Sequence, residues 1–319
     1  MIEVKGISKK YGETIAVNNI SFEVKAHENL ILLGTSGCGK TTTLKMLNRL
    51  IEPDNGQIFI NGEDVIKQNP EKLRRGVGYV MQNTGLFPHY TIEENISVVP
   101  KLLGWKKSET ANRINELIEK LHLPQDSLKL FPNQLSGGQQ QRVGLARALV
   151  ANPSVLLMDE PFGALDNVTR NSIRKEFKDL EELKRKTIVM VTHDVQEAFE
   201  LGDRICLMDK GEIMQIGTPK ELLFNPANNF SAKFLEGEKL ALEFKIIRIE
   251  DVWNSLPEAS KVDGIRFSPE LTVWDAMEKL QSANVSELIF CSKEGVSKKV
   301  NFHDLTSAFN QFKNSHLHE

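Results

Sequence analysis

A glycine-rich segment between a predicted strand and a predicted helix constrains this chain more than any other part of its sequence. Residues 34–41 read Gly-Thr-Ser-Gly-Cys-Gly-Lys-Thr and fit the pattern G-x-x-x-x-G-K-[ST]. The apolar run Leu30 to Leu33 before it predicts a buried strand, and leucines at threefold and fourfold spacing predict a helix over Thr42 to Leu50. Glycines let backbone N–H groups turn towards an anion, and a helix N-terminus adds positive partial charge. The segment therefore predicts a phosphate-binding loop in an α/β fold.

Individual residues of this loop have distinct expected roles. Lys40 would reach the terminal phosphates of a nucleotide, and the Thr41 hydroxyl would hold Mg²⁺. Cys38 occupies a free position of the pattern, where it is either a small tolerated residue or a redox-active thiol. The candidate nucleotide-binding residues of this segment are Gly34, Thr35, Ser36, Gly37, Cys38, Gly39, Lys40, Thr41 and Thr42.

Length, hydropathy and charge exclude several classes of protein. The 319 residues suffice for about two domains, or for one large domain with an appendage. No uninterrupted apolar run exceeds four residues, which excludes a membrane-spanning helix of about 20 residues. The net charge of −3 gives no overall electrostatic reason to bind nucleic acid. Cys38, Cys206 and Cys291 form no C-x-x-C pair, which argues against a disulfide framework and fits a reducing cytosol.

Two further apolar runs predict buried strands joined by a crossover. Val155 to Met158 and Ile188 to Val191 flank a helical pattern over Asn171 to Leu183, so we expect a parallel sheet. Residues from about 90 to 150 are rich in helical patterns. The polar, glycine-containing stretch Glu236 to Lys239 is typical of a linker.

These patterns predict two domains. The first covers residues 1–236 and contains a helical subdomain over about 90–150. The second covers residues 237–319 and carries strand and helix signals of its own.

A second anion-receiving helix start lies far along the chain from the loop. Leu135-Ser136-Gly137-Gly138-Gln139 precedes a helical segment, so its backbone amides also suit an anion. One chain does not ordinarily need two such starts for one nucleotide. A head-to-tail dimer resolves this, because each ATP then lies between one subunit's loop and the Ser-Gly-Gly of the partner, with two equivalent sites.

Together these motifs resemble those of the ATP-binding-cassette (ABC) ATPases. Leu135 to Gln139 looks like their signature motif, and Val155 to Glu160 looks like their Walker B strand. The resemblance implies a P-loop cassette ATPase with a mixed sheet, a helical subdomain, and ATP and Mg²⁺ as ligands. It further implies that Asp159 holds Mg²⁺ and that Glu160 orients or deprotonates the attacking water.

Four single residues match further elements of the family. Gln82 resembles the Q-loop glutamine, which contacts Mg²⁺ and the transport partner, and His193 resembles the switch histidine at the γ-phosphate. Asp166 lies in a segment similar to the D-loop, which touches the opposite site. Tyr11 resembles the aromatic residue that stacks on adenine, and a strand-edge tyrosine is the alternative. The motifs match over residues 1 to about 236, with Gly163 where many members have Ser.

Within this family the sequence indicates a separate importer subunit. Only 95 residues separate Lys40 from Leu135, which leaves no room for the long coiled coil of repair and condensin-type members. The segment from Gly85 to Ile96 looks like the place where the coupling helix of a membrane subunit docks. Partners implied by the resemblance are integral-membrane permease subunits, a second copy of the ATPase and, indirectly, a solute-binding protein. We therefore expect a peripheral location at the cytoplasmic face of the inner or plasma membrane; the alternative is a regulatory or DNA-associated cassette ATPase without a permease.

The solute class comes from finer resemblance. Residues 158–166 with Thr169-Arg170, and residues 131–143, are similar to the importers of glycine betaine, choline and carnitine. Importers of polyamines, sulfate or sugars share much of this pattern and stay open as alternatives.

The last 80 or so residues resemble a single cystathionine-β-synthase (CBS) motif. Ser268 to Met277 predicts the start of a helix, Val285 to Cys291 a strand, and Gly295 a turn. Residues 240–262 would then be a degenerate first copy of the motif. The resemblance implies a regulatory module that senses ionic strength or a nucleotide, and a dimerisation tail without a ligand is the alternative.

Overall fold

The computed structural model describes residues 1–259, 265–292 and 295–316. The chain divides into two compact units, unit 1 (Met1–Thr218) and unit 2 (Pro219–Glu319). Residues 219–236, which the sequence analysis assigns to the first domain, belong by their contacts to unit 2. The boundary of the ATPase domain at residue 236 stays a prediction.

Unit 1 contains two β-sheets. One is antiparallel with strand order β2-β1-β4-β5. The other has the order β10-β9-β3-β8-β7-β6, and it is parallel except where β10 pairs with β9. The predicted α/β class with a mixed sheet is thereby confirmed. The strands are β1 (Ile2–Tyr11), β2 (Thr14–Val24), β3 (Asn29–Gly34), β4 (Asn55–Ile60), β5 (Glu63–Asp64), β6 (Val77–Val80), β7 (Val155–Asp159), β8 (Thr187–Thr192), β9 (Arg204–Asp209) and β10 (Glu212–Gly217).

The parallel strands with continuous apolar runs are buried, as those runs predict. Every residue of β7 and β8 is buried, because helices cover both faces of a parallel sheet. The carboxyl ends of β3, β6, β7 and β8 lie at one edge of the sheet. The segments that follow these four strands therefore converge, although they are far apart in the sequence.

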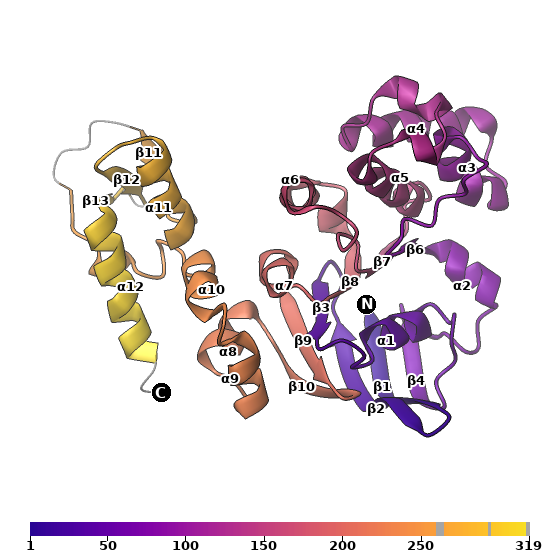
Figure 1. Ribbon diagram of the computed structural model, residues 1–319, viewed down its shortest axis with the longest axis horizontal. Coiled ribbons are helices and arrows are strands. Elements are labelled where there is room, and N and C mark those ends of the chain that lie inside the picture. Colours follow the sequence, from indigo (N-terminus) through magenta and orange to yellow (C-terminus); the bar gives the residue numbers. More distant parts are fainter. Residues whose placement is uncertain (260–264, 293–294, 317–319) are drawn as a thin grey trace. The chain divides into compact units, whose positions relative to one another are not determined.

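The helices of unit 1 occupy different places around the mixed sheet. Helix α1 packs against the mixed sheet, whereas α3, α4 and α5 gather as a group beyond β6 and β7 (Figure 1). This group occupies the segment for which a helical subdomain was expected. The helices are α1 (Lys40–Leu47), α2 (Pro70–Gly76), α3 (Ile92–Leu102), α4 (Lys107–Lys120), α5 (Gly137–Leu149), α6 (Asn167–Asp179) and α7 (Val195–Leu201).

Two helices begin earlier than their apolar patterns predict. Helix α1 starts at Lys40 and not at Thr42, and it ends before Arg49, whose φ of 48° is left-handed. Helix α6 starts at Asn167 because the Asp166 carboxylate accepts hydrogen bonds from the next turn. Periodicity locates the buried face of a helix, but the caps decide where it begins.

The core of unit 1 joins the two sheets and α1. Its fully buried members include Ile7 of β1, Val17 of β2, Leu32 of β3 and Leu47 of α1. Burial of each such side chain contributes about 1.5–3 kcal/mol relative to leaving it exposed. The glycine-rich segment is therefore attached at both ends to rigid, buried elements.

Unit 2 is a small α/β unit around its own apolar core, with Phe290 and Leu305 among the buried members. Its three-stranded sheet has the order β11-β12-β13. Residues 240–262 are the stretch that the sequence suggests as a degenerate first CBS copy. Of these, residues 260–262 lie outside the described residues. The elements are α8 (Pro219–Phe224), α9 (Asn229–Leu235), α10 (Lys239–Ile246), β11 (Arg266–Phe267), α11 (Val273–Ser282), β12 (Leu288–Cys291), β13 (Ser297–Val300) and α12 (Phe302–His316).

Among the described residues, every helix is too short or too polar to cross a lipid bilayer.

Candidate functional site

The glycine-rich segment forms a loop between β3 and α1. Gly37 and Gly39 have φ of 77° and 103°, a region that residues with a Cβ rarely adopt. Ser36 and Gly37 are exposed, whereas Thr41 and Thr42 lie half-buried in the first turn of α1. The loop therefore presents backbone to solvent at the N-terminal end of a helix, as an anion-binding loop requires.

Lys40 lies inside this loop. Its Nζ donates hydrogen bonds to the carbonyl oxygens of Gly34 (2.9 Å) and Thr35 (2.8 Å), and the residue is only 6% exposed. The Cys38 Sγ lies 3.7 Å from the same Nζ and is buried within the apolar core. The loop thus contains one fixed positive charge.

A second turn supports the loop from outside. The Thr35 hydroxyl donates to Asp209 Oδ1 (2.9 Å), and the Gly211 N–H donates to the Cys38 carbonyl (3.1 Å). Asp209-Lys210-Gly211 is typical of a hairpin turn in the sequence, and nothing in that pattern indicates this supporting role. Only the strand order places this turn beside the loop, because β9 ends at Asp209 and is the neighbour of β3.

Thr41 and Asp159 meet at the sheet edge. The Thr41 hydroxyl donates to Asp159 Oδ1 at 2.9 Å. The pKa of the Asp159 carboxyl is raised, mainly because the group is buried and also because the Glu160 charge is near. The Thr41 hydrogen bond and nearby lysines lower it by less. A buried carboxylate beside a hydroxyl is a set of oxygen ligands that suits Mg²⁺, and a cation there would stabilise the charged form.

Glu160 is contacted by two other predicted site residues, Gln82 and His193. Its Oε2 accepts a hydrogen bond from Gln82 Nε2 (2.9 Å) and lies 3.2 Å from His193 Nδ1. These residues follow β7, β6 and β8, so the parallel sheet brings them together. Glu160 also has a left-handed φ of 44°, and its N–H donates to the Val191 carbonyl. Such backbone strain in a non-glycine residue is concentrated at functional sites.

The signature-like segment lies at the start of α5. Ser136 is its N-cap, and the Ser136 and Gln139 side chains form a reciprocal capping box that leaves Gly137 and Gly138 in the first turn. The Asp166 side chain caps α6 by accepting hydrogen bonds from the Val168 and Thr169 N–H groups, and hydrogen bonds from Thr169 lower the pKa of its carboxyl. Within the described part of the chain, no hydrogen bond or ion pair joins residues 136–139 or Asp166 to the glycine-rich loop.

Tyr11 ends β1 and is exposed, so its ring is free to meet a planar ligand. The Lys9 ammonium lies 5.9 Å from the centroid of the Tyr11 ring.

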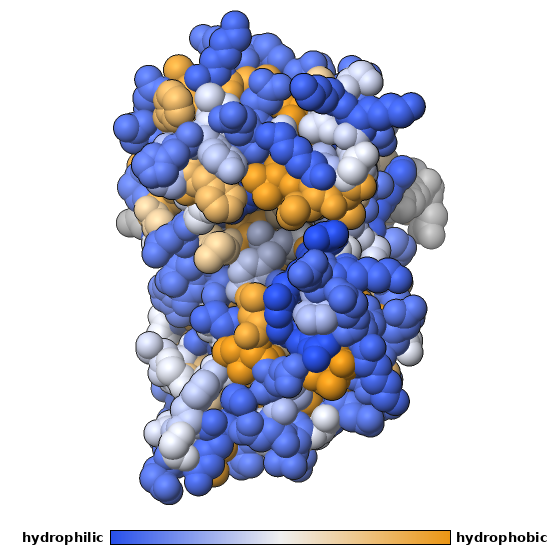
Figure 2. Space-filling view, turned by 90° about the vertical axis from the view of Figure 1, so that its right-hand side faces the viewer, coloured by the Kyte–Doolittle hydropathy of each residue, from blue (hydrophilic) through white to orange (hydrophobic). Residues whose placement is uncertain are grey.

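Apolar side chains are exposed on both sides of Gln82 in the sequence. Met81, Phe87 and Tyr90 are 48%, 47% and 44% exposed, and the Phe87 and Tyr90 ring centroids are 5.3 Å apart. Figure 2 shows the face of the molecule that carries α2 and α3, where apolar residues gather in a band. We name residues 84–91 the docking segment.

Two side chains, half-buried Arg147 and buried Asn95, hold the docking segment in place. Arg147 of α5 donates to the carbonyls of Thr84 and Gly85, both at 2.7 Å. Asn95 of α3, fully buried, donates to and accepts from Phe87. The exposed aromatic rings are thus presented on a fixed backbone.

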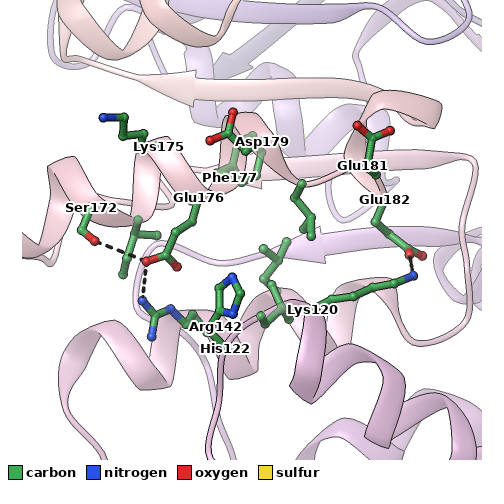
Figure 3. Close-up of a pocket in the computed structure, with 14 residues that line it drawn as sticks. Lys120, His122, Arg142, Ser172, Lys175, Glu176, Phe177, Asp179, Glu181 and Glu182 are labelled. Carbon is green, nitrogen blue, oxygen red and sulfur yellow. Dashed lines mark hydrogen bonds and ion pairs between the residues drawn. The ribbon is translucent and has the colours of Figure 1, made fainter.

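A cavity of about 520 Å³ lies apart from these residues, between the end of α4, α5 and α6. Figure 3 shows charged pairs across it, Arg142 with Glu176 and Lys120 with Glu182. Among the described residues that line it, none is a predicted site residue. The cavity does not belong to the site at the sheet edge.

Known proteins are similar to this chain over most of its length. The profile of the family described as "ABC transporter" matches residues 17–163. The chain is 46% identical over 300 residues to the glycine betaine/carnitine/choline transport ATP-binding protein OpuCA of Bacillus subtilis, covering 93% of this chain and 77% of that protein. It is 43% identical over 277 residues to the glycine betaine uptake system ATP-binding protein YehX of Escherichia coli, covering 87% and 89%.

A solved structure is also similar. It is a dimeric ATP-binding cassette in a post-hydrolysis state bound to ADP and Pi, with a TM-score of 0.61 and 34% sequence identity. The similarity covers 68% of this chain and 98% of that one.

Proposed function

The chain belongs to the ABC transporter ATP-binding proteins of glycine betaine, choline and carnitine uptake systems, and we propose that its sheet-edge site hydrolyses ATP to drive a separate permease. The observation that carries this proposal is the convergence of Gln82 and His193 on one carboxylate oxygen of Glu160, beside the Thr41–Asp159 pair. Such an arrangement holds a general base next to the place where a γ-phosphate would lie.

In the proposed reaction Glu160 orients and deprotonates the attacking water. Gln82 and His193 fix the rotamer of its carboxylate, so the base needs little reorganisation when the water attacks. His193 is exposed and Nδ1 faces Glu160, which leaves the other ring nitrogen for the γ-phosphate.

The residues present fit a Mg²⁺ ion. Asp159 and the Thr41 hydroxyl supply hard oxygen ligands at one point of the sheet edge, and the Gln82 amide oxygen is the third candidate ligand. A bound Mg²⁺ supplies neutralisation of the charge on the phosphate oxygens. The nucleotide itself is held by the amides of the loop and by Lys40, with its adenine on Tyr11.

A complete site requires two copies of the chain. Ser136 to Gln139 and Asp166 stand at helix starts that make no hydrogen bond to the loop of their own chain within the described residues. In a head-to-tail dimer those segments would contact the ATP bound by the partner. A dimeric cassette structure of similar fold supports this arrangement.

The permease partner would dock on the exposed aromatic residues of the docking segment. Phe87 and Tyr90 give the large rigid apolar contacts that interfaces favour. Held by the permease at the cytoplasmic face of the membrane, the dimer would close on ATP and reopen after hydrolysis. A solute-binding protein would deliver the solute from the other side, and the chain itself has no expected contact with nucleic acid.

The catalytic assignment is tested by Glu160→Gln. This variant keeps the hydrogen bond from Gln82 but loses the base, so it should bind ATP, hold the dimer closed and lose steady-state turnover. Glu119→Gln, an exposed substitution on α4, is the matched control and should keep full ATPase activity. Substantial steady-state hydrolysis by Glu160→Gln would refute the role of Glu160.

The transport assignment is tested separately. Co-purification from detergent-solubilised membranes should recover the chain with a multi-span partner, whereas recovery in a purely soluble complex would favour a non-transport cassette ATPase. Glycine betaine, choline or carnitine should stimulate ATP hydrolysis by the reconstituted complex. Stimulation by a polyamine, sulfate or a sugar instead would assign the chain to another importer.

For residues 237–319, which lie within unit 2, we infer a CBS-like regulatory or dimerisation role. The supporting observation is a compact sheet-and-helix unit with a separate core, in which Thr272 caps α11 and β12 pairs with β13. Retained binding of an adenine nucleotide by a Lys40→Ala, Tyr11→Ala chain would favour nucleotide sensing. Loss of all binding would favour ionic-strength sensing or a purely structural role.

A further inference from the structure

Arg170 of α6 contacts three groups with one guanidinium. Its Nε donates to the Phe162 carbonyl (3.2 Å), and Nη2 donates to the Leu165 carbonyl (2.8 Å). Its Nη1 lies 3.8 Å from Asp194 Oδ2. The side chain is 23% exposed, so the guanidinium is largely withdrawn from solvent.

The two carbonyls belong to the turn that begins at Glu160. The Gly163 N–H donates to the Glu160 carbonyl (3.1 Å), and the Leu165 N–H donates to the Phe162 carbonyl (3.2 Å). Glu160 enters this turn with a left-handed φ of 44°. Arg170 therefore holds the far side of a strained turn whose first residue is the proposed base.

The third contact lies next to His193. The Asp194 N–H donates to the Thr192 hydroxyl, and its Oδ1 accepts from the Glu197 N–H as the N-cap of α7. The other oxygen, Oδ2, faces Arg170 and also Arg174, at 3.9 Å. Arg170 is thus linked through Asp194 to the backbone that carries the switch-like histidine.

We propose that Arg170 is a positioning residue, which sets the separation of Glu160 and His193 by clamping the two turns that carry them. The inference rests on the proposed roles of these two residues. Glu160 Oε2 and His193 Nδ1 are 3.2 Å apart, and each belongs to a segment that Arg170 holds. A planar fork with five donors can serve two carbonyls and a carboxylate at once, which a lysine ammonium on a flexible stem cannot do in this geometry.

The first experiment compares steady-state kinetics of full-length variants. Arg170→Met should lower kcat by about tenfold to a hundredfold, because a misplacement of about 1 Å has a cost of this size. The KM for ATP should stay within about threefold, since the glycine-rich loop and Tyr11 are untouched. Arg170→Lys keeps one donor and should restore part of kcat.

Two further variants separate positioning from general stability. Glu176→Gln removes the ion pair of α6 with Arg142 (Figure 3) but leaves the Phe162 and Leu165 carbonyls held, so it should keep normal kcat. Asp194→Asn keeps an oxygen for the α7 cap and removes the charge that faces Arg170, so it should lower kcat without lowering the unfolding temperature.

A double-mutant cycle with His193→Ala tests whether Arg170 acts through the Glu160–His193 pair. The rates are measured in single-turnover conditions so that slow variants can be compared. If Arg170 acts through the Glu160–His193 pair, Arg170→Met should cause little further loss in the His193→Ala background. An equal loss in both backgrounds, a kcat within twofold of normal, or a rise in KM alone would overturn the inference. Normal turnover by Glu160→Gln would instead refute the proposed function, so the two failures are distinguishable.

Discussion

Two glycines of the same loop should respond very differently to alanine. Gly37 and Gly39 both have positive φ, 77° and 103°. A Cβ added at Gly37 would meet nothing within 4 Å. A Cβ at Gly39 would lie 2.3 Å from the Ala16 carbonyl oxygen and 3.2 Å from Val17 Cγ2. Ala16 and Val17 are strand residues of β2, so the obstacle at Gly39 is held by a sheet.

The expected costs follow from these two surroundings. Gly37→Ala should lose about 1–2 kcal/mol of stability from left-handed strain, partly offset by a less flexible unfolded chain. Gly39→Ala adds about 1–3 kcal/mol for overpacking against backbone that cannot rotate away. Its φ is also farther from the region that alanine tolerates, where strain costs about 1–3 kcal/mol. We therefore expect Gly39→Ala to cost roughly 2–4 kcal/mol more than Gly37→Ala.

Scanning calorimetry of the full chain measures the difference. At roughly 2–4 °C per kcal/mol for a domain of this size, Gly37→Ala should lower Tm by about 2–8 °C and Gly39→Ala by clearly more. ATP binding should also weaken more in Gly39→Ala, because relief of the clash moves the N-terminal end of α1. Equal Tm shifts for the two variants would refute the geometric argument.

Two further predictions concern titration and reactivity. Hydrogen bonds from Lys120 and then Arg113 lower the pKa of Glu116 from 4.5 to about 2. A lowered native pKa adds stability above pH 4.5, and this stability is lost as the pH falls towards 2. In Glu116→Gln the free energy of unfolding, measured with urea, should therefore depend less on pH across this interval. A difference from the unchanged chain that is the same at all pH values would contradict the prediction. Burial raises the pKa of the Cys206 thiol, and Cys38 is also buried, so iodoacetamide should modify half-buried Cys291 first, as peptide mass spectrometry would detect. Faster labelling of Cys38 would show that the loop opens.

The position of the candidate site could be predicted from the sequence because its residues are confined to short patterns next to strands. The glycine-rich segment, Asp159, Glu160 and His193 each follow an apolar run that reads as a buried strand. Parallel strands then place all of them at one sheet edge, which β3, β7 and β8 do. Periodicity could not fix where α6 begins, because the Asp166 cap decides it. Nor could it assign residues 219–236 to the second unit, since that depends on side chains 20 to 90 residues further on.

The sequence by itself determined the local requirements of this protein. Glycines stand where φ must be positive, a lysine and a threonine stand at a helix start, and acids follow a buried strand. Only the tertiary structure decided which distant groups share an atom or a charge. Gln82 and His193 meet on Glu160, Asp209 supports Thr35, and Arg170 spans two turns. Such contacts depend on strand order and on side-chain direction, and neither can be deduced from the spacing of residues in the sequence.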